Sequence, residues 1–301
     1  MDSSNLGGKA GRLARQTANK ADGTANEVAR NEWVHRLGRL GYATRGIVYL
    51  LVGGLATVAA LGHGGQLTDK NGALRIIHDQ PLGQLLLGIV TVGLFGYALW
   101  SLIKAIADTE NKGTDPKGIV VRISYAVIAL SYGFLAFTAL QLLLGSGNGG
   151  QSSDTKTQDW TARFLNLPFG QALVVIAGLI VLGAAAAEFY QAYKAKPLDH
   201  LNQAEMSPKM RQGAKWFCQI GLASLGVVIG LIGLFLIIAA LQHNPSQAKG
   251  LGGALQELAK QPYGQVLLCL VSLGLAIYGV YSLFEARYHQ FTTSRTRRTS
   301  K

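Results

Sequence analysis

Pro81-Leu82-Gly83-Gln84 occurs three times in this chain in closely related form and gives the first indication of its architecture. The other two copies are Pro168-Phe169-Gly170-Gln171 and Pro262-Tyr263-Gly264-Gln265, 87 and then 94 residues further on. Each copy follows a short segment of similar pattern and opens a long apolar segment. The repetition therefore predicts three tandem units of one design.

Six windows of the sequence contain no Asp, Glu, Lys or Arg, namely 46–68, 80–103, 123–153, 164–187, 216–248 and 261–284. A transmembrane helix needs about 20 mostly apolar residues to cross a hydrocarbon core of roughly 30 Å, and each window is long enough. Backbone polar groups in lipid must be satisfied within their own segment, so such windows are expected to be helices. We predict an all-α integral membrane protein with six transmembrane helices as three tandem two-helix repeats. An unusually apolar soluble helical bundle is the alternative.

Polar segments divide the chain into five parts: a cytoplasmic tail over 1–36, repeats over 37–107, 117–194 and 214–288, and a basic cytoplasmic tail over 289–301. Near the end of the first tail, Trp33, Leu37 and Leu40 are spaced to share one helical face, with arginines nearby. This pattern is typical of an amphipathic helix lying on the membrane surface. A helix docked on the protein's own cytoplasmic face would have the same periodicity.

The units agree beyond the corner motif, and units one and three agree best. Aligned on the proline, Gly93 matches Gly274, Tyr97 matches Tyr278, and Trp100 matches Tyr281, while unit two has Ile180, Ala184 and Ala187. Each unit crosses the membrane twice, so all three have the same orientation, unlike the inverted repeats of many transporters. A pseudo-threefold arrangement about the membrane normal and a row of hairpins both fit this pattern.

The formal net charge of +12 is concentrated in four segments. Of the 28 Lys and Arg residues, 22 lie in 1–46, 104–122, 194–215 and 287–301, which share one side of the membrane if the chain crosses six times. The positive-inside rule then places both termini in the cytoplasm. This distribution argues against a nucleic-acid-binding surface and predicts anionic lipid headgroups as the partner of the basic residues.

The corner motif has a structural explanation. A proline at the first helical position lacks only an N–H that would be unpaired there, and its φ is already helical. The glycine two residues later permits close approach of another segment, for which the preceding short helix is the candidate. The Gln could hydrogen-bond neighbouring backbone at the outer interface. The alternative is a ligand site formed by Gln84, Gln171 and Gln265, which would have to converge.

Aromatic residues mark the other end of these helices. Tyr97, Trp100, Tyr278 and Tyr281 lie 16–19 residues past the proline, roughly 24–29 Å along a helix, which is typical of an interfacial aromatic belt. Glu188 and Glu285 fall at the same end, and we expect them to pair with Arg122, Lys104 or Arg287. No charged residue is expected near the middle of any helix, which argues against an ion-coupled transporter.

The residues also resemble a known family. The motifs that carry the resemblance are Arg39-Leu40-Gly41-Tyr42-Ala43-Thr44-Arg45-Gly46, Gly72-Ala73-Leu74, the Pro-x-Gly corner, and Gly96-Tyr97-Ala98-Leu99-Trp100. Together they are similar to the bacterial membrane family "domain of unknown function 1206", which has three two-helix repeats, over about residues 37–288. The second unit lacks the Arg-Gly pair and the Tyr/Trp pair. The resemblance implies the fold and a bacterial inner (plasma) membrane location, and no activity.

Two classes of function remain open. The first is a non-enzymatic membrane component that interacts with lipid or with a protein partner. The alternative is a channel or transporter for a small, neutral solute, lined by Thr91, Ser131, Thr138, Gln141, Ser224 and Ser272. We expect no enzymatic activity, no cofactor and no metal, because zinc-binding, phosphate-binding and nucleophile motifs are absent from the sequence. Cys218 and Cys269 are expected to be unpaired, and the six histidines lie in predicted tails and loops.

Overall fold

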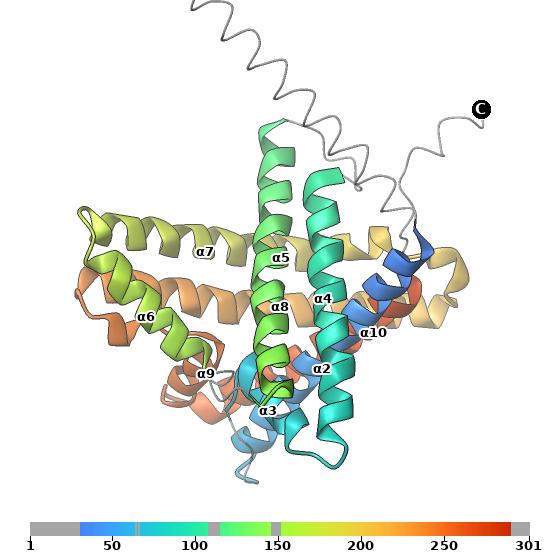
Figure 1. Cartoon of the computed structure of the whole chain (residues 1–301), viewed down its shortest axis with the longest axis horizontal. Coiled ribbons are helices and arrows are strands. Elements are labelled where there is room, and N and C mark those ends of the chain that lie inside the picture. Colours follow the sequence, from blue (N-terminus) through green and yellow to red (C-terminus); the bar gives the residue numbers. More distant parts are fainter. Residues whose placement is uncertain (1–30, 64, 66, 108–114, 146–151, 290–301) are drawn as a thin grey trace, which may run out of the picture.

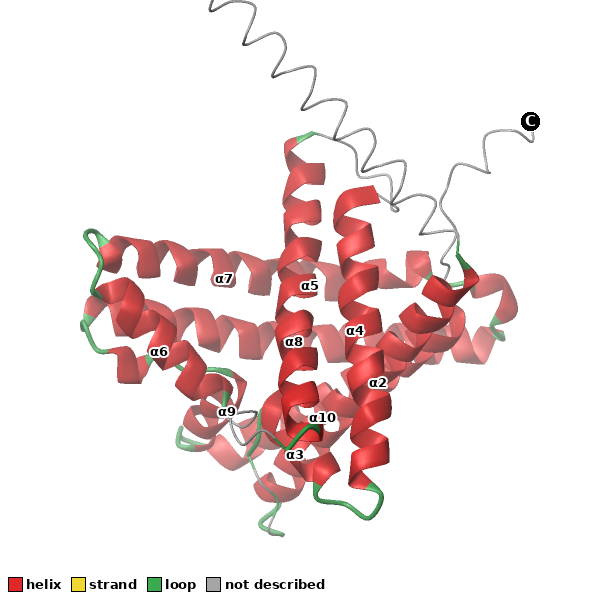
Figure 2. Cartoon of the chain, viewed as in Figure 1, coloured by secondary structure: helices red, strands yellow, loops and turns green. Residues whose placement is uncertain are grey.

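The computed structural model describes residues 31–63, 65, 67–107, 115–145 and 152–289, and these residues are mainly helical (Figure 1, Figure 2). Six of their helices are long and apolar enough to cross a membrane. They are α2 (Glu32–Ala60), α4 (Gly83–Ala107), α5 (Pro116–Leu143), α7 (Gly170–Lys194), α8 (Pro208–Leu241) and α10 (Gly264–Tyr288). The predicted fold class is therefore confirmed.

A short helix separates the two long helices of each repeat. These are α3 (Lys70–His78), α6 (Ser153–Leu165) and α9 (Leu251–Ala259). Three short 3-10 helices lie in the connections, at η1 (Lys196–His200), η2 (Gln203–Glu205) and η3 (Pro245–Gln247). The repeats are thus α2-α3-α4, α5-α6-α7 and α8-α9-α10.

The repeats pack on one another in cyclic order, each on the next and the third on the first. The second long helix of each repeat packs on the first of the next, as α4 on α5, α7 on α8, and α10 on α2. In Figure 1 the α4/α5 pair runs vertically and the α7/α8 pair horizontally, so the pairs are splayed and not parallel. Within a repeat, α2 packs on α4 and α8 on α10, whereas α5 and α7 share no comparable interface among the described residues. The arrangement is therefore a ring of repeats that is open within the second one.

The repeated corner differs from the prediction in where the helix begins. The long helices start at the glycines Gly83, Gly170 and Gly264, two residues after the proline. The residue before each glycine has a positive φ, 63° at Leu82, 61° at Phe169 and 60° at Tyr263. A left-handed conformation costs a side-chain-bearing residue roughly 1–2 kcal/mol. The proline therefore belongs to the turn, because the residue after it reverses the chain direction before the helix begins.

The predicted role of the glycine in this corner is confirmed. A Cβ added to Gly83 would lie 2.6 Å from the carbonyl carbon of His78, and one added to Gly264 would lie 2.5 Å from that of Ala259. Both positions lie at the C-terminal end of the short helix that precedes the corner. Only a residue without a side chain lets the long helix start against these carbonyl groups.

Helix α2 corrects the prediction of a separate amphipathic helix before the first crossing. The helix runs without interruption from Glu32 to Ala60, and the Asn31 side chain caps it by accepting the N–H of Trp33 at 2.9 Å. Residues 27–30 lie outside the described part of the chain. The segment is continuous because no proline interrupts it, and because Gly41 packs on the backbone of Tyr97, where a Cβ would lie 2.6 Å from the Tyr97 nitrogen.

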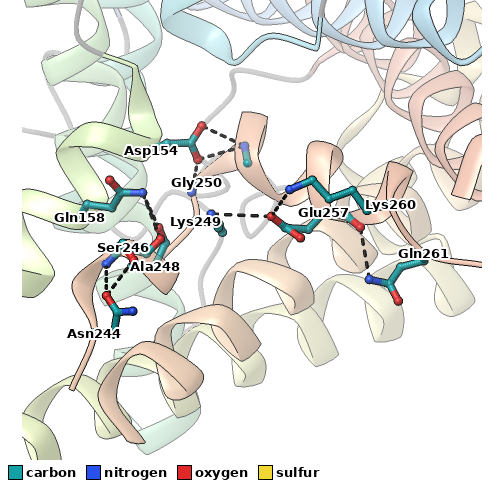
Figure 3. A network of polar contacts seen from close by, with 11 residues as sticks. Asp154, Gln158, Asn244, Ser246, Ala248, Lys249, Gly250, Glu257, Lys260 and Gln261 are labelled. Atoms are coloured by element: carbon teal, nitrogen blue, oxygen red, sulfur yellow. Dashed lines mark hydrogen bonds and ion pairs between the residues drawn. The ribbon is translucent and has the colours of Figure 1, made fainter. Parts of the chain in front are cut away.

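Two aspartates join the N-termini of the short helices. Asp69 caps α3 by accepting the N–H of Gly72 at 2.8 Å, and it also accepts the N–H of Ser153 at the start of α6. Asp154 of α6 accepts the N–H of Gly250 at 2.5 Å and of Gly253 at 2.9 Å (Figure 3). Helix α9 has glycine at its N-cap and no side-chain cap of its own, so α6 supplies the cap from another repeat.

The same junction contains further contacts between α6 and the third repeat. Gln158 donates to the carbonyl groups of Ser246 and Ala248, both at 3.3 Å (Figure 3). Glu257 pairs with Lys260 at 2.9 Å and with Lys249 at 3.7 Å within the third repeat. The Gln158 contacts, together with those of Asp154, hold the second and third repeats together at the ends where the short helices lie.

Asp154→Ala is expected to lower the free energy of unfolding by about 1–2 kcal/mol, because α9 loses its only side-chain cap and partly buried N–H groups lose their acceptor. The matched control is Asp159→Ala, which removes an exposed carboxylate from the same helix. Unfolding in detergent, followed by circular dichroism, measures both variants. Equal stability of the two variants would show that the cap from α6 contributes nothing.

Candidate functional site

A buried ion pair joins the first and third repeats. The guanidinium group of Arg45, near the middle of α2, pairs with the carboxylate of Glu285 on α10, and the two side chains are only 8% and 10% exposed. Arg45 also donates from Nε to Ser282 Oγ at 3.1 Å and from Nη1 to the hydroxyl of Tyr97. Glu285 therefore pairs with Arg45, which was not among its predicted partners, and the expectation that no charge lies near the middle of a helix was wrong.

Aromatic rings surround this arginine. Its guanidinium carbon lies 5.0 Å from the ring centroids of Tyr42 and Tyr97, and 5.2 Å from that of Tyr278. A cation over an aromatic face is attracted by the ring quadrupole, by about 2 kcal/mol or more where water is excluded. The rings thus stabilise a charge that would otherwise be costly to bury.

Two lysines extend the arrangement in opposite directions. Lys104 of α4 donates to the hydroxyl of Tyr42 at 3.2 Å, and its Nζ lies 5.0 Å from the ring centroid of Tyr125. Lys70, the first residue of α3, has its Nζ 4.9 Å from the ring centroid of Tyr49 and 4.7 Å from that of Tyr132.

Ring contacts connect the lysines to the arginine. Tyr49 meets Tyr278 edge-to-face at 4.9 Å, and Tyr97 meets Tyr132 edge-to-face at 4.6 Å between centroids. We call the whole set the cation–tyrosine column; it consists of Lys70, Tyr49, Tyr132, Tyr278, Tyr97, Arg45, Tyr42 and Lys104. Intramembrane ionisable residues are functional by default, and this column is the candidate functional site.

The column follows the sequence repeat. Lys104 and Glu285 both lie 23 residues after the corner proline of their unit. Tyr42 and Tyr49 of α2 have their counterparts in α5, where Tyr125 and Tyr132 lie seven residues apart in the same way. A stripe of Tyr42, Arg45 and Tyr49 on one face of α2 was the signal that could have revealed the site, because these positions follow helical periodicity.

A short β-bridge closes the Lys104 end of the column. Leu201 pairs with His289 in an antiparallel bridge, and the N–H of Asn202 donates to the carbonyl of Tyr288 at 2.7 Å. The ring of His289 lies 4.8 Å from that of Tyr42. Burial, together with the charge of Lys104, holds the pKa of His289 well below its usual range, so its imidazole is neutral at physiological pH. His289 is thus buried, although the sequence placed it in the C-terminal tail.

Glu188 lies near this site on α7. It is within electrostatic range of both Arg45 and Glu285, and its side chain is partly buried. The prediction that it pairs with a basic residue at a helix end is not borne out by any ion pair within the described part of the chain.

The structure does not bring together the six polar residues predicted to line a solute path. Thr91 on α4 donates to a carbonyl of its own helix at 2.7 Å. Thr138 on α5 accepts from Lys156 of α6 at 3.2 Å. Ser272 on α10 lies 2.9 Å from the hydroxyl of Thr57 on α2. These three hydroxyls therefore have separate partners on different helices.

The other three polar residues are equally dispersed. Ser131 is exposed on α5, and Gln141 is half-buried on the same helix. Ser224 lies against Gly274 at the contact of α8 with α10, where a Cβ on the glycine would be 2.5 Å from the Ser224 Cβ. The structure therefore does not support a solute path lined by these six residues.

The three Gln residues of the corners lie at separate helix starts. Gln84 and Gln265 are exposed, and Gln171 is half-buried. Figure 1 places the start of α4 at the bottom of the molecule and the start of α7 at its left edge, so a site formed by converging Gln side chains is not supported. Cys218 and Cys269 are free thiols. Within the described residues, no group of three or more His, Cys, Asp or Glu is placed to hold a metal ion.

Comparison with known proteins adds the relationship to a family. The family model described as Domain of Unknown Function (DUF1206) matches three stretches, 40–108, 123–195 and 220–289. The chain is 35% identical over 260 residues to the "Uncharacterized protein YxxB" of Bacillus subtilis (strain 168), which covers 86% of this chain and 93% of that protein. No solved structure matches the chain.

Proposed function

The chain belongs to the DUF1206 family, and we propose that it is a non-enzymatic component of the bacterial cell membrane that acts by binding anionic lipid headgroups. Both termini are placed in the cytoplasm in this proposal, because 22 of the 28 Lys and Arg residues lie in segments of one side and positive charge marks the cytoplasmic side of membrane proteins. A reporter fused to either terminus would test this orientation, and an extracytoplasmic signal from one of them would contradict it.

The observation that carries the proposal is a set of pairs of basic and aromatic side chains at these helix ends, all of them exposed except Tyr288, which is half-buried. The cation lies over the ring at 5.1 Å for Arg36 and Trp33, 5.3 Å for Lys194 and Tyr193, 4.6 Å for Lys196 and Tyr190, and 5.6 Å for Arg287 and Tyr288. Amphipathic rings settle at the headgroup level of a membrane. Each nearby Lys or Arg contributes about 1 kcal/mol of attraction to an anionic leaflet.

The apolar faces of the long helices support contact with lipid between these ends. On α5 the exposed side chains include Val120, Ile123, Val127, Leu130 and Phe134. They recur every three or four residues, so they form one continuous stripe along the helix. A soluble protein rarely exposes an apolar surface of this extent, which is expected where acyl chains cover it.

Neutralising the basic residues at these ends is expected to reduce the anionic lipid that remains bound after purification. The triple variant Lys194→Gln, Lys196→Gln and Arg287→Gln should retain at least about tenfold less anionic lipid, at about 1 kcal/mol for each charge. Native mass spectrometry after purification in a gentle detergent measures the bound lipid.

The matched control removes three basic residues from the opposite ends, as Arg163→Gln, Lys249→Gln and Lys260→Gln. We expect it to retain as much anionic lipid as the wild-type chain. Equal retention of anionic and zwitterionic lipid by the wild-type chain would contradict the proposal. A stoichiometric protein partner in place of lipid would also contradict it.

A further inference from the structure

The three repeated corners share one backbone conformation. In each of them the N–H of the glycine donates to the carbonyl group three residues before it, at 2.7 Å for Gly83, 2.9 Å for Gly170 and 2.7 Å for Gly264. The residue between the proline and the glycine has a positive φ in all three. A proline followed by a residue with positive φ, inside a turn closed by this hydrogen bond, is the pattern of a type II turn.

The residue with the positive φ is of an unexpected type in all three turns. This position of a type II turn favours glycine or asparagine, because a Cβ is unfavourable in the left-handed conformation. The same residue precedes the long helix, where a serine, threonine, aspartate or asparagine would cap a backbone N–H. The chain has Leu82, Phe169 and Tyr263 here, and neither aromatic side chain makes a cap. An unfavourable conformation of this kind is typical of a functional constraint, which must then concern the side chains.

These three side chains are among the most exposed apolar side chains of the described residues. Leu82 is 75% exposed, Phe169 is 87% exposed and Tyr263 is 86% exposed. In water such side chains would stabilise nothing, whereas transfer of their apolar surface into an apolar environment is favourable. Contact with lipid would therefore offset the unfavourable backbone conformation of the corner.

Each corner residue also continues an exposed apolar stripe of the helix that follows it. Side chains four and seven residues further along lie on the same side of a helix. At these two positions every one of the three helices has an exposed apolar residue: Leu86 and Ile89 on α4, Leu173 and Ile176 on α7, and Leu267 and Leu270 on α10. The apolar outer surface of each helix thus extends without interruption to its corner.

The arrangement of the corners indicates a bilayer as their common partner. Each repeat supplies one corner, and Figure 1 places the start of α4 at the bottom of the molecule and the start of α7 at its left edge. A protein partner docks on one side of a transmembrane protein, whereas lipid surrounds it. Lipid is therefore the partner that can contact all three corners at once.

From these observations we propose that Leu82, Phe169 and Tyr263 are apolar anchors, which insert into lipid at the boundary of the hydrocarbon core on the side where α3, α6 and α9 lie. Their contacts are with acyl chains, so the charge of the lipid headgroups has no influence on them. The apolar anchors are thus independent of the proposed binding of anionic headgroups, which involves the opposite helix ends.

The depth of nitroxide spin labels in phosphatidylcholine vesicles tests this proposal. The full chain carries Cys218→Ala and Cys269→Ala, and it is labelled either at Phe169→Cys or at the matched control Asn166→Cys, an exposed polar position three residues earlier. Collisions with oxygen, which concentrates in lipid, are compared with collisions with a nickel chelate, which stays in water. We expect the label at Phe169 to lie about 5–10 Å deeper than the control, the depth to which interfacial apolar faces are buried.

The other two corners should give the same result. Labels at Leu82→Cys and Tyr263→Cys are expected at the depth of the label at Phe169→Cys, and added phosphatidylglycerol should leave all depths unchanged. Corner labels that collide with the nickel chelate as often as the control label would lie in water, which would overturn the proposal. Labels shielded from both reagents would lie against protein, which would also overturn it.

A second measurement covers the case in which the cysteine-free chain does not fold. The photoreactive residue p-benzoylphenylalanine in place of Phe169 keeps an aromatic side chain and both native cysteines. Irradiation in phosphatidylcholine vesicles should attach lipid to this residue, and mass spectrometry of the chain detects the adduct. The same residue in place of Asn166 should give far less adduct. Equal amounts of lipid adduct at the two positions would contradict the apolar anchors.

Discussion

Glu285→Ala is expected to lower the free energy of unfolding by about 3–5 kcal/mol, because it leaves the charge of Arg45 buried without its carboxylate. The arginine side chain is 8% exposed, so water cannot replace the lost partner without rearrangement of α2 and α10. Its remaining contacts to Ser282, Tyr97 and the surrounding rings are dipoles and quadrupoles. These groups orient the guanidinium group but supply no full negative charge.

Two further variants identify the origin of this loss. Glu257→Ala removes a carboxylate that is paired with Lys249 and Lys260 near the surface, and such exposed pairs contribute at most about 1 kcal/mol. Arg45→Met combined with Glu285→Met should recover most of the stability, because well-packed apolar residues can replace a buried pair. Unfolding by SDS in mixed micelles measures all three. If Glu285→Ala were no less stable than Glu257→Ala, the buried pair would contribute nothing to the fold.

Much of the fold was predictable because the membrane limits the choices. Only helices and closed barrels satisfy their backbone in lipid, and windows of 20 or more apolar residues have the length of a crossing helix. All six predicted windows lie in long helices. The corner motif also revealed its close contact, since glycine two residues after proline has a steric purpose in each repeat. The start of the helix was misplaced because proline favours the first helical position in general. Here the positive φ of Leu82, Phe169 and Tyr263 displaces the start by two residues.

The candidate site was missed because a charged residue was taken to mark the end of a membrane-spanning segment. Arg45 was counted with the basic residues of segment 1–46, yet α2 continues on both sides of it. Its partner Glu285 is 240 residues away in sequence, and no local pattern identifies such a pair. Lys70 lies in the sequence between two of the charge-free windows, and only the packing of α3 between α2, α4 and α5 directs it toward the tyrosines.

The sequence does indicate, however, that the two long helices of the second repeat do not pack on each other. At Gly93 and Gly274 the first long helix of the same repeat packs closely against the second. A Cβ added to Gly93 would lie 2.9 Å from the Thr44 Cβ, and one added to Gly274 would lie 2.5 Å from the Ser224 Cβ. The second repeat has Ile180 at this position, and Ile180 is 67% exposed. The isoleucine side chain occupies the space that glycine leaves free for the first helix of the repeat. Helices α5 and α7 therefore each pack on a neighbouring repeat.

Gly53→Ala is expected to lower the free energy of unfolding by about 2–3 kcal/mol, because overpacking displaces helix backbones that cannot adjust as side chains do. Gly53 faces α10, where an added Cβ would lie 2.6 Å from the carbonyl oxygen of Ser272 and 2.9 Å from the Cα of Ala276. Helices α2 and α10 form the contact between the first and third repeats, and they carry the two sides of the Arg45–Glu285 pair. Separating them would therefore also weaken the ion pair.

The adjacent glycine provides the matched control. A Cβ on Gly54 meets nothing within 4 Å, so Gly54→Ala should be neutral or stabilising by up to about 1 kcal/mol, the difference in helix propensity. Unfolding by SDS measures both variants under the same conditions. Opposite signs would show that the contact of α2 with α10 depends on the absence of one methyl group at Gly53. Equal effects would mean that the two helices can separate without cost, and the close contact at Gly53 would then not stabilise the fold.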